Sequence, residues 1–331
     1  MEDKNARKLV IARAHVRRED FSALVRGRAA LVASTGGHLE QIVRLRRLLG
    51  IDPHPLWITF DTPQARSLLS QEQRIVYVPY VGSRDLRGTA RTVVPMAAAL
   101  RDYKPDVVLS TGAALAGAAL PLARVCGSTA VYLESVSRFR GPSMTGRVLA
   151  GMPGIHTFTQ HSGWANRKWR PGPSLLRTFV ATVAPGEKAV RRVFVTLGTI
   201  RPWRFDALVD RLLDILPPDC HVVWQLGATT RSDIPGSVYS QLPAREFDEE
   251  AQAADVVVSH AGVGSVLRLL ELGVAPILVP RSAARGEHVD DHQHQLTAAM
   301  RETGCAVTID SPEDLQWSHF RSAAHTIIST A

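Results

Sequence analysis

The sequence predicts an α/β protein with two doubly wound domains, each built on a parallel sheet. Short β-branched runs alternate with helical patterns in two successive series, which is typical of repeated βαβ units. The length of 331 residues suits about two domains of ~150 residues each. A stretch rich in proline, glycine and basic residues, 163–188, separates the two series and suits an interdomain connection.

The first series reads as a parallel sheet because its strands are continuous apolar runs. Its strands are expected at residues 29–34, 56–60, 75–78, 106–110 and 129–133, and its helices at 39–49, 85–101 and 115–125. The second series repeats the pattern. Its strands are expected at residues 192–197, 221–226, 255–259, 275–279 and 306–309, and its helices at 205–216, 264–272 and 292–303. The expected domains are an extension over 1–28, an N-terminal domain over 29–170, a linker over 171–190 and a C-terminal domain over 191–331.

Composition excludes several classes of protein. The apolar fraction of 45% excludes wholesale disorder, and no apolar run is long enough for a membrane-spanning helix. The N-terminus lacks the apolar stretch of a secretory signal. Cys126, Cys220 and Cys305 lie far apart, which excludes a zinc module and favours a reducing, cytoplasmic setting.

The net charge of +8 is unevenly distributed. Residues 1–180 carry 26 basic and 12 acidic side chains, whereas residues 181–331 carry 13 and 19, so the two parts have charges of +14 and −6. This asymmetry indicates an anionic partner for the first part: nucleic acid, a membrane surface or a phosphorylated substrate. An arginine-rich surface that serves solubility is the alternative. No recognition helix or aromatic RNA-binding motif is present, which disfavours nucleic acid.

Two glycine loops follow predicted strands. The first contains Thr35, Gly36, Gly37 and His38, and its glycines allow a sharp turn that exposes amides at a helix start. His38 is a candidate general base or a hydrogen-bond partner for an acceptor phosphate, with a surface histidine in a capping loop as the alternative. The loop is neither a Walker motif nor a dinucleotide fingerprint.

The second loop is the more specific of the two motifs. His260, Gly262, Gly264 and Ser265 form a turn whose amides are suited to a diphosphate at a helix N-terminus. Glu271, six positions after Ser265, is a candidate for the hydroxyls of a ribose, or else a solvated helix residue.

A polar tract over residues 287–295 follows the next predicted strand. His288 and His292 have i, i+4 spacing but lack the glutamate of a zincin helix, so we expect no metal site. Asp291 and Gln293 are the side chains best placed to bind a sugar.

Taken together, these motifs resemble a known family. Residues 193–199, 259–265, 271–273, 279–281 and 292–295 are similar to the C-terminal domain of GT-B glycosyltransferases of the MurG type, family 28. Residues 34–38, 109–112, 132–135 and 143–147 resemble the partner subunit of the enzyme that adds the second GlcNAc to dolichol-pyrophosphate-GlcNAc, and related bacterial polysaccharide transferases. The chain therefore looks like a single-chain fusion of two subunits, with two Rossmann-like domains that face a cleft.

The resemblance implies specific roles. Gly198 and Thr199 would face the donor phosphates, Gly262, Gly264 and Ser265 would hold the diphosphate, and Glu271 would hold the ribose. His260 belongs to the same donor loop, and Gln293 would contact the donor sugar, with Asp291 and Gln295 as alternatives. Thr35, Gly36 and Gly37 would lie on the acceptor side, where either His38 or Glu134 would act as the base.

The expected function is inverting, metal-independent sugar transfer from a UDP-sugar, without a cofactor. The expected acceptor is a lipid-diphosphate-linked saccharide in cell-surface polysaccharide or glycolipid synthesis, and the expected donor sugar is GlcNAc or glucuronic acid, the latter because of Arg281 and Arg285. A soluble transferase acting on a small natural product and a UDP-sugar epimerase of GT-B fold are the alternatives. The family's transmembrane anchor has no counterpart in this sequence, so we expect a cytoplasmic protein in peripheral contact with anionic membrane through Trp164, Lys168, Trp169 and Arg170. A packed interdomain linker is the alternative for these four residues.

Overall fold

The computed structural model describes residues 20–81, 86–186, 188–199, 202–288 and 292–330. The chain divides between Leu175 and Leu176 into two compact units, and each is described by itself. Among the described residues, no helix has both the length and the apolar character that a membrane span requires.

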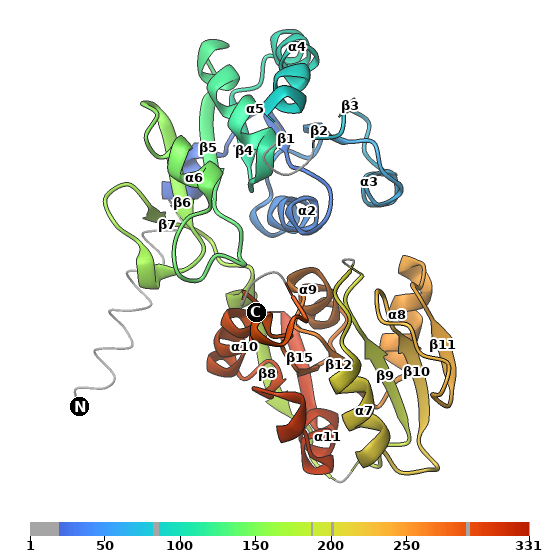
Figure 1. Ribbon diagram of the computed structural model, residues 1–331. Coiled ribbons are helices and arrows are strands. Elements are labelled where there is room, and N and C mark those ends of the chain that lie inside the picture. The colour runs from blue at the N-terminus through green and yellow to red at the C-terminus, as the bar shows by residue number, and fades with distance from the viewer. Residues whose placement is uncertain (1–19, 82–85, 187, 200–201, 289–291, 331) are drawn as a thin grey trace, which may run out of the picture. The chain divides into compact units, whose positions relative to one another are not determined.

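The N-terminal unit contains a seven-stranded parallel sheet in the order β3-β2-β1-β4-β5-β6-β7 (Figure 1). Its strands are β1 (Ala29–Val32), β2 (Leu56–Phe60), β3 (Ile75–Val78), β4 (Val107–Ser110), β5 (Thr129–Leu133), β6 (Ile155–Thr159) and β7 (Arg170–Pro171). Its helices are α2 (Gly37–Leu49), α3 (Pro63–Leu68), α4 (Leu86–Tyr103), α5 (Ala113–Val125) and α6 (Met144–Leu149). The order doubles back at β1, as in Rossmann-like folds.

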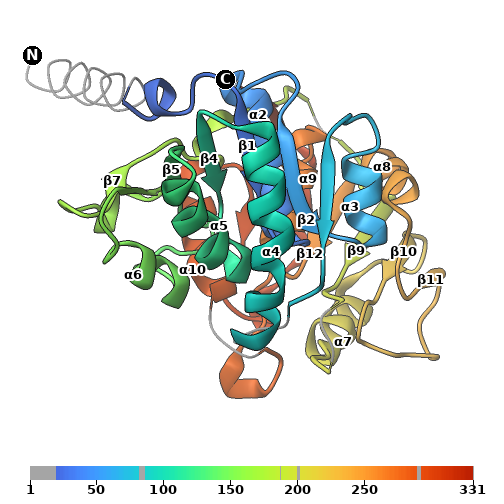
Figure 2. The same ribbon diagram turned by 90° about the horizontal axis from the view of Figure 1, so that it is seen from above.

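Helix α5 shows why this sheet packs well. Leu115, Ala116, Ala119, Leu120 and Ala123 recur at helical spacing and are all buried. The alanines among them allow α5 to lie against β4 and β5, and Figure 2 shows α4 beside it. Together they cover one face of the sheet, and every residue of the central strands β1 and β4 is buried.

The C-terminal unit contains a six-stranded parallel sheet in the order β11-β10-β9-β12-β13-β14. Its strands are β9 (Arg192–Thr196), β10 (His221–Gln225), β11 (Ser237–Tyr239), β12 (Val256–Ser259), β13 (Ile277–Leu278) and β14 (Val307–Thr308). Its helices are α7 (Asp206–Ile215), α8 (Ala244–Ala253), α9 (Val263–Glu271), α10 (His292–Thr303) and α11 (Trp317–Ala324). The prediction of two Rossmann-like parallel sheets is confirmed.

The structure differs from the expected boundaries at both ends of the N-terminal domain. Residues 20–24 of the expected extension are helical, and Phe21 is buried against Phe158 with ring centroids 4.9 Å apart. The expected linker, 171–190, contains β8 (Phe179–Val183), which pairs antiparallel with β15 (Thr326–Thr330) near the C-terminus. These backbone hydrogen bonds make β8 part of the C-terminal unit.

Candidate active site

His38 lies in the first turn of α2, at the edge of the N-terminal sheet where the strands end. Its Nδ1 atom lies 2.9 Å from the carbonyl oxygen of Thr111. Because a carbonyl oxygen can only accept, Nδ1 carries the proton of the neutral ring and Nε2 remains the basic nitrogen. The Thr111 hydroxyl donates in return to the carbonyl oxygen of His38, at 2.8 Å. The loop after β4 therefore fixes both the orientation and the tautomer of His38.

Two further features keep His38 neutral and close to this loop. Burial lowers its pKa from the ordinary value of 6.5; the hydrogen bond to Thr111 opposes that change, and the charge of Arg138 adds to it. Gly112 has a φ of 130°, and a Cβ there would lie 2.8 Å from Cε1 of His38. The close approach of the ring to the β4 loop therefore requires glycine at position 112.

The predicted acceptor-side loop lies next to His38. Thr35, Gly36 and Gly37 are all half-buried, and Gly36 has a φ of 84° as the N-cap of α2. The amide of Gly36 donates to the side-chain oxygen of Gln64 at 2.7 Å. That amide is therefore already paired, and it is not an open anion site as the sequence suggested.

Glu134, the second candidate base, has a different environment. Its side chain is buried, and one oxygen accepts from the Tyr132 hydroxyl at 3.0 Å and the Ser135 amide at 3.1 Å. The other oxygen accepts from the amide and hydroxyl of Ser143, at 2.8 and 3.0 Å. Four donors occupy the carboxylate, so the geometry favours a role in holding the loop between β5 and α6.

The residues expected to contact a membrane are mostly part of the N-terminal core. Trp169 is buried, with ring centroids 5.2 Å from Trp164 and 5.9 Å from Tyr132. Arg170 pairs with Asp20 at 2.7 Å and lies over the ring of Phe158. Trp169 is therefore unavailable for the membrane contact expected of this cluster, whereas Lys168 is exposed and Trp164 and Arg170 are partly exposed. The contact expected of these three residues stays a prediction.

In the C-terminal unit, the donor loops follow β9 and β12. Gly198 and Thr199 follow β9, and the carbonyl oxygen of Gly198 accepts from the Ala228 amide at 3.1 Å. His260 is buried behind the β12 loop, with Nδ1 3.2 Å from the carbonyl oxygen of Thr196. Burial, and next the charge of Arg281, lower the pKa of His260 to about 3. His260 is thus a neutral ring that links the two loops, because its Nδ1–H donates to the strand β9.

The amino end of α9 is the clearest anion site in this unit. Gly262 is its N-cap, and no side chain caps the helix. The first-turn amides of Val263, Gly264 and Ser265 have no partner within the helix, since the first N–H groups of any helix lack one. These residues are half-buried, so the positive end of the helix dipole is accessible.

Glu271 lies at the other end of the same helix. It is exposed and forms the last residue of α9, six positions and therefore about 9 Å along the axis from Ser265. A role with the ribose requires the nucleoside to run along α9, and this role stays a prediction.

The polar tract after β13 is held together by its own contacts. Gln293 is buried, and its side-chain oxygen accepts from the amide of Arg281 at 2.9 Å. Arg285 pairs with Glu287 at 3.1 Å, and the other oxygen of Glu287 accepts from the Ser282 amide at 2.9 Å. Arg285 is thus neutralised locally, which removes its support for an acidic donor sugar. Asp291 lies outside the described residues, and Gln295 is half-buried on α10.

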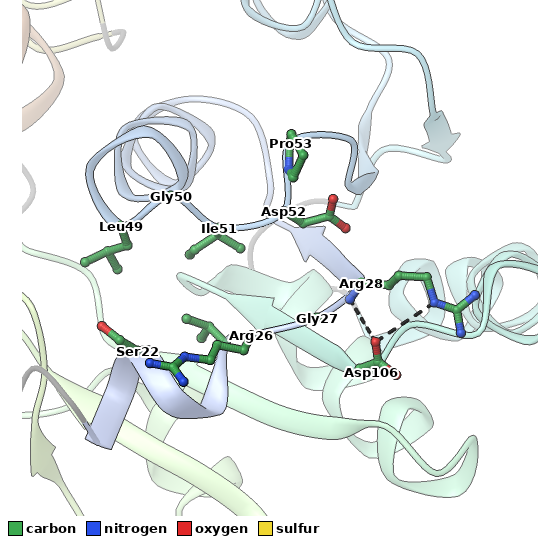
Figure 3. Close-up of a pocket in the computed structure, with 11 residues that line it drawn as sticks. Ser22, Arg26, Gly27, Arg28, Leu49, Gly50, Ile51, Asp52, Pro53 and Asp106 are labelled. Atoms are coloured by element: carbon green, nitrogen blue, oxygen red, sulfur yellow. Dashed lines mark hydrogen bonds and ion pairs between the residues drawn. The ribbon is translucent and has the colours of Figure 1, made fainter.

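A separate pocket lies at the opposite edge of the N-terminal sheet, where strands begin (Figure 3). The carboxylate of Asp106 accepts from the Arg28 amide at 2.8 Å, and that of Asp52 accepts from the Ala29 amide at 2.8 Å. Both carboxylates thus secure strand starts, whereas ligands of doubly wound sheets bind at strand ends. Within the described ranges, no three metal-binding side chains gather in a cluster.

Sequence reasoning missed several residues around the two candidate centres. Thr111, Gly112 and Arg138 surround His38, and Thr196 anchors His260. Thr111 and Gly112 follow a strand in a serine-threonine-glycine run, which was a usable signal. Nothing local in the sequence marks Arg138, because only the fold brings it near His38.

Residues 193–318 match the glycosyltransferase family 28 C-terminal domain. The chain is a family 28-type glycosyltransferase. It is 26% identical over 310 residues to the UDP-N-acetylglucosamine--N-acetylmuramyl-(pentapeptide) pyrophosphoryl-undecaprenol N-acetylglucosamine transferase of Shewanella amazonensis, covering 85% of this chain and 83% of the relative. The predicted membership in this family and the glycosyltransferase activity are confirmed.

Solved structures show that this glycosyltransferase has the GT-B fold. MurG of Acinetobacter baumannii superposes with a TM-score of 0.56 at 16% identity, covering 89% of each chain. The spinosyn forosaminyltransferase SpnP superposes with a TM-score of 0.59 at 14% identity, covering 90% of this chain and 93% of that one. The same fold is therefore present in MurG and in a forosaminyltransferase.

Proposed function

We propose that this glycosyltransferase moves a sugar from a UDP-sugar to a hydroxyl of a polyprenyl-diphosphate-linked saccharide, with inversion and without a metal ion. The observation that carries the proposal is the uncapped amino end of α9 within the family 28 domain. Free amides at a helix start bind the diphosphate of a nucleotide sugar and stabilise the charge that develops as UDP departs. The relative from Shewanella amazonensis carries UDP-N-acetylglucosamine and a pyrophosphoryl-undecaprenol acceptor in its name, which supports this donor and acceptor class.

The proposed chemistry assigns the acceptor to the N-terminal unit. Nε2 of His38 accepts the proton of the acceptor hydroxyl as its oxygen bonds to the anomeric carbon. The bond between that carbon and the β-phosphate oxygen breaks, and its electron pair leaves with UDP. Glu134 positions the loop after β5, since its four hydrogen bonds leave the carboxylate engaged.

GlcNAc is the donor sugar we propose first. The case for glucuronic acid depended on Arg281 and Arg285, but Arg285 pairs with Glu287 and Arg281 is buried. Gln293 fits a neutral sugar better, because its Nε2 makes no hydrogen bond to any described residue and can donate to a hydroxyl.

Ligand binding and transfer test this function together. We expect UDP and UDP-GlcNAc to raise the melting temperature, and UDP to be released only when a polyprenyl-diphosphate saccharide is present, including in EDTA. UDP-glucuronic acid serves as the control donor in place of UDP-GlcNAc. A small aromatic aglycone serves as the control acceptor in place of the polyprenyl-diphosphate saccharide. Transfer to the aglycone alone would favour a natural-product transferase, and no response to any uridine nucleotide would refute the proposal.

We also propose peripheral contact with anionic membrane at α6. Met144, Val148 and Met152 follow one another at intervals of four and expose 67%, 55% and 37% of their surface, with exposed Arg147 between them. Apolar side chains beside a cation favour an anionic bilayer surface. Changing Met144 and Val148 to serine should reduce sedimentation with anionic liposomes, while Val125→Ser, at another exposed apolar position, should not. Equal sedimentation of the α6 variant and the wild type would disprove this contact.

A further inference from the structure

Arg281 is an unusual residue in the C-terminal unit because it is charged and almost completely buried. Only 1% of its surface is exposed. One terminal nitrogen, Nη1, donates to the carbonyl oxygen of Trp203 at 3.1 Å, and the buried Nε has no hydrogen-bond partner. No carboxylate in the described ranges forms an ion pair with it. Burying a cation with so few partners is costly, so a purely structural role does not explain it.

The guanidinium lies directly behind the loop after β9. A Cβ on Gly198 would overlap the other terminal nitrogen, Nη2, so only glycine allows this approach. Gly198 and Thr199 are the residues predicted to face the donor phosphates. The charge of Arg281 therefore lies on one side of the Gly198 backbone, and the ligand is expected on the other side.

Two more donor-site residues are linked to Arg281. Its backbone amide donates to the side chain of Gln293 at 2.9 Å. Its charge lowers the pKa of buried His260, whose ring lies at the amino end of α9 beside Gly262. The field of Arg281 thus reaches the β12 loop as well as the β9 loop.

Among the described residues, Glu287 is the acidic group that acts on Arg281, and it does not neutralise it. Glu287 acts on it only through space, raising a pKa that burial lowers to about 10. The two oxygens of Glu287 are occupied by Arg285 and by the amide of Ser282. Among the described residues of this unit, no carboxylate therefore pairs with the positive charge behind the donor loops.

We propose that Arg281 is the buried counter-charge of the donor diphosphate: it holds the Gly198 loop from behind and favours binding of a nucleoside diphosphate in front of it. This inference rests on the proposed function, because it takes the β9 and β12 loops as the diphosphate site. Arg281 is a positioning residue, since the backbone of Gly198 separates it from the ligand. The binding energy it supplies depends on ligand charge.

Calorimetric titration of the full chain with UDP, UMP and uridine tests this dependence. We expect Arg281→Met to weaken UDP binding by about 10–100-fold, as loss of one unit charge several ångströms away implies. UMP binding should weaken less, and uridine binding should stay unchanged in a competition assay. A merely structural defect would weaken all three ligands alike, and that result would overturn the inference.

Two further variants control for folding and for net charge. Arg281→Lys keeps the charge and should retain most of the preference for UDP over UMP; equal loss in Arg281→Lys and Arg281→Met would overturn the counter-charge role. If Arg281→Met fails to fold, Arg281→Gln replaces it in the comparison with lysine. Arg245→Met removes the same charge from a side chain that is 90% exposed, and should bind UDP normally. A wild-type chain that does not bind UDP would instead refute the proposed function.

Discussion

Replacing His38 with alanine is expected to lower kcat by about 10²–10⁴-fold, the usual contribution of a general base. The neutral ring donates through Nδ1 to the carbonyl oxygen of Thr111, so Nε2 is the nitrogen that accepts the proton. UDP affinity should not change, because the proposed donor site lies in the C-terminal unit. Initial rates with saturating donor and acceptor, with calorimetric UDP binding alongside, measure both quantities.

The pH profile of kcat separates a base from a residue that only supports the loop. Burial, together with the charge of Arg138, lowers the pKa of His38, while the hydrogen bond to Thr111 opposes this. A base must be deprotonated, so the rate should rise with pH, with the midpoint of the acidic limb below the ordinary histidine value. Arg138→Gln removes a charge that lowers the pKa, so the acidic limb should move to higher pH. A limb that does not move in this variant would contradict the assignment.

Glu134→Gln is the matched test of the alternative base. The four hydrogen bonds to its carboxylate predict a loss of stability, at about 1.5–3 kcal/mol for a bond to a charged group, seen as a lower melting temperature. The folded fraction should keep most of its kcat. If Glu134→Gln abolishes turnover in folded protein while His38→Ala does not, the two roles are exchanged.

Changing Gly262 to alanine is expected to weaken UDP binding by about 10–100-fold, which corresponds to roughly 1.4–2.7 kcal/mol. A Cβ at this position would overlap Nε2 of His260, so the ring or the loop has to move. Either movement displaces the N-cap of α9 and with it the amides that would hold the diphosphate. Calorimetric titration with UDP measures the loss.

The control for this substitution is Gly163→Ala. A Cβ at Gly163 has nothing within 4 Å, so the same change should leave both UDP affinity and melting temperature unaltered. Gly262 itself has a φ of −78°, which alanine adopts readily, so any effect there comes from the clash with His260. Normal UDP binding by Gly262→Ala would show that the amino end of α9 is not the diphosphate site.

Several of the elements that escaped prediction have weak local patterns. Strands β8, β11 and β15 are short or largely exposed, so they lack the continuous apolar run that marks a buried strand. Helix α8 buries only Phe247 and Ala251 within a strongly polar segment. Such elements are defined by their neighbours: β8 and β15 lie almost 150 residues apart and exist as strands because they pair.

The candidate site was predictable where its chemistry depends on backbone conformation. Gly262 and Gly264 follow a buried strand, and glycine after a buried strand indicates a turn that exposes amides. The availability of a side chain was not predictable in this way. His38 and Glu134 both follow strands. In His38, Nε2 makes no hydrogen bond to a described residue, whereas the carboxylate of Glu134 accepts four.

By itself, the sequence determined the two parallel sheets, the glycine loops at their strand ends and the membership in family 28, since these depend on local patterns of apolar residues and glycine. Only the tertiary structure decided which charged and aromatic groups are accessible. Trp169 lies in the core, Arg285 is paired, and Arg281 is buried behind Gly198. Burial and electrostatic environment depend on residues distant in the chain, so no local pattern contains them.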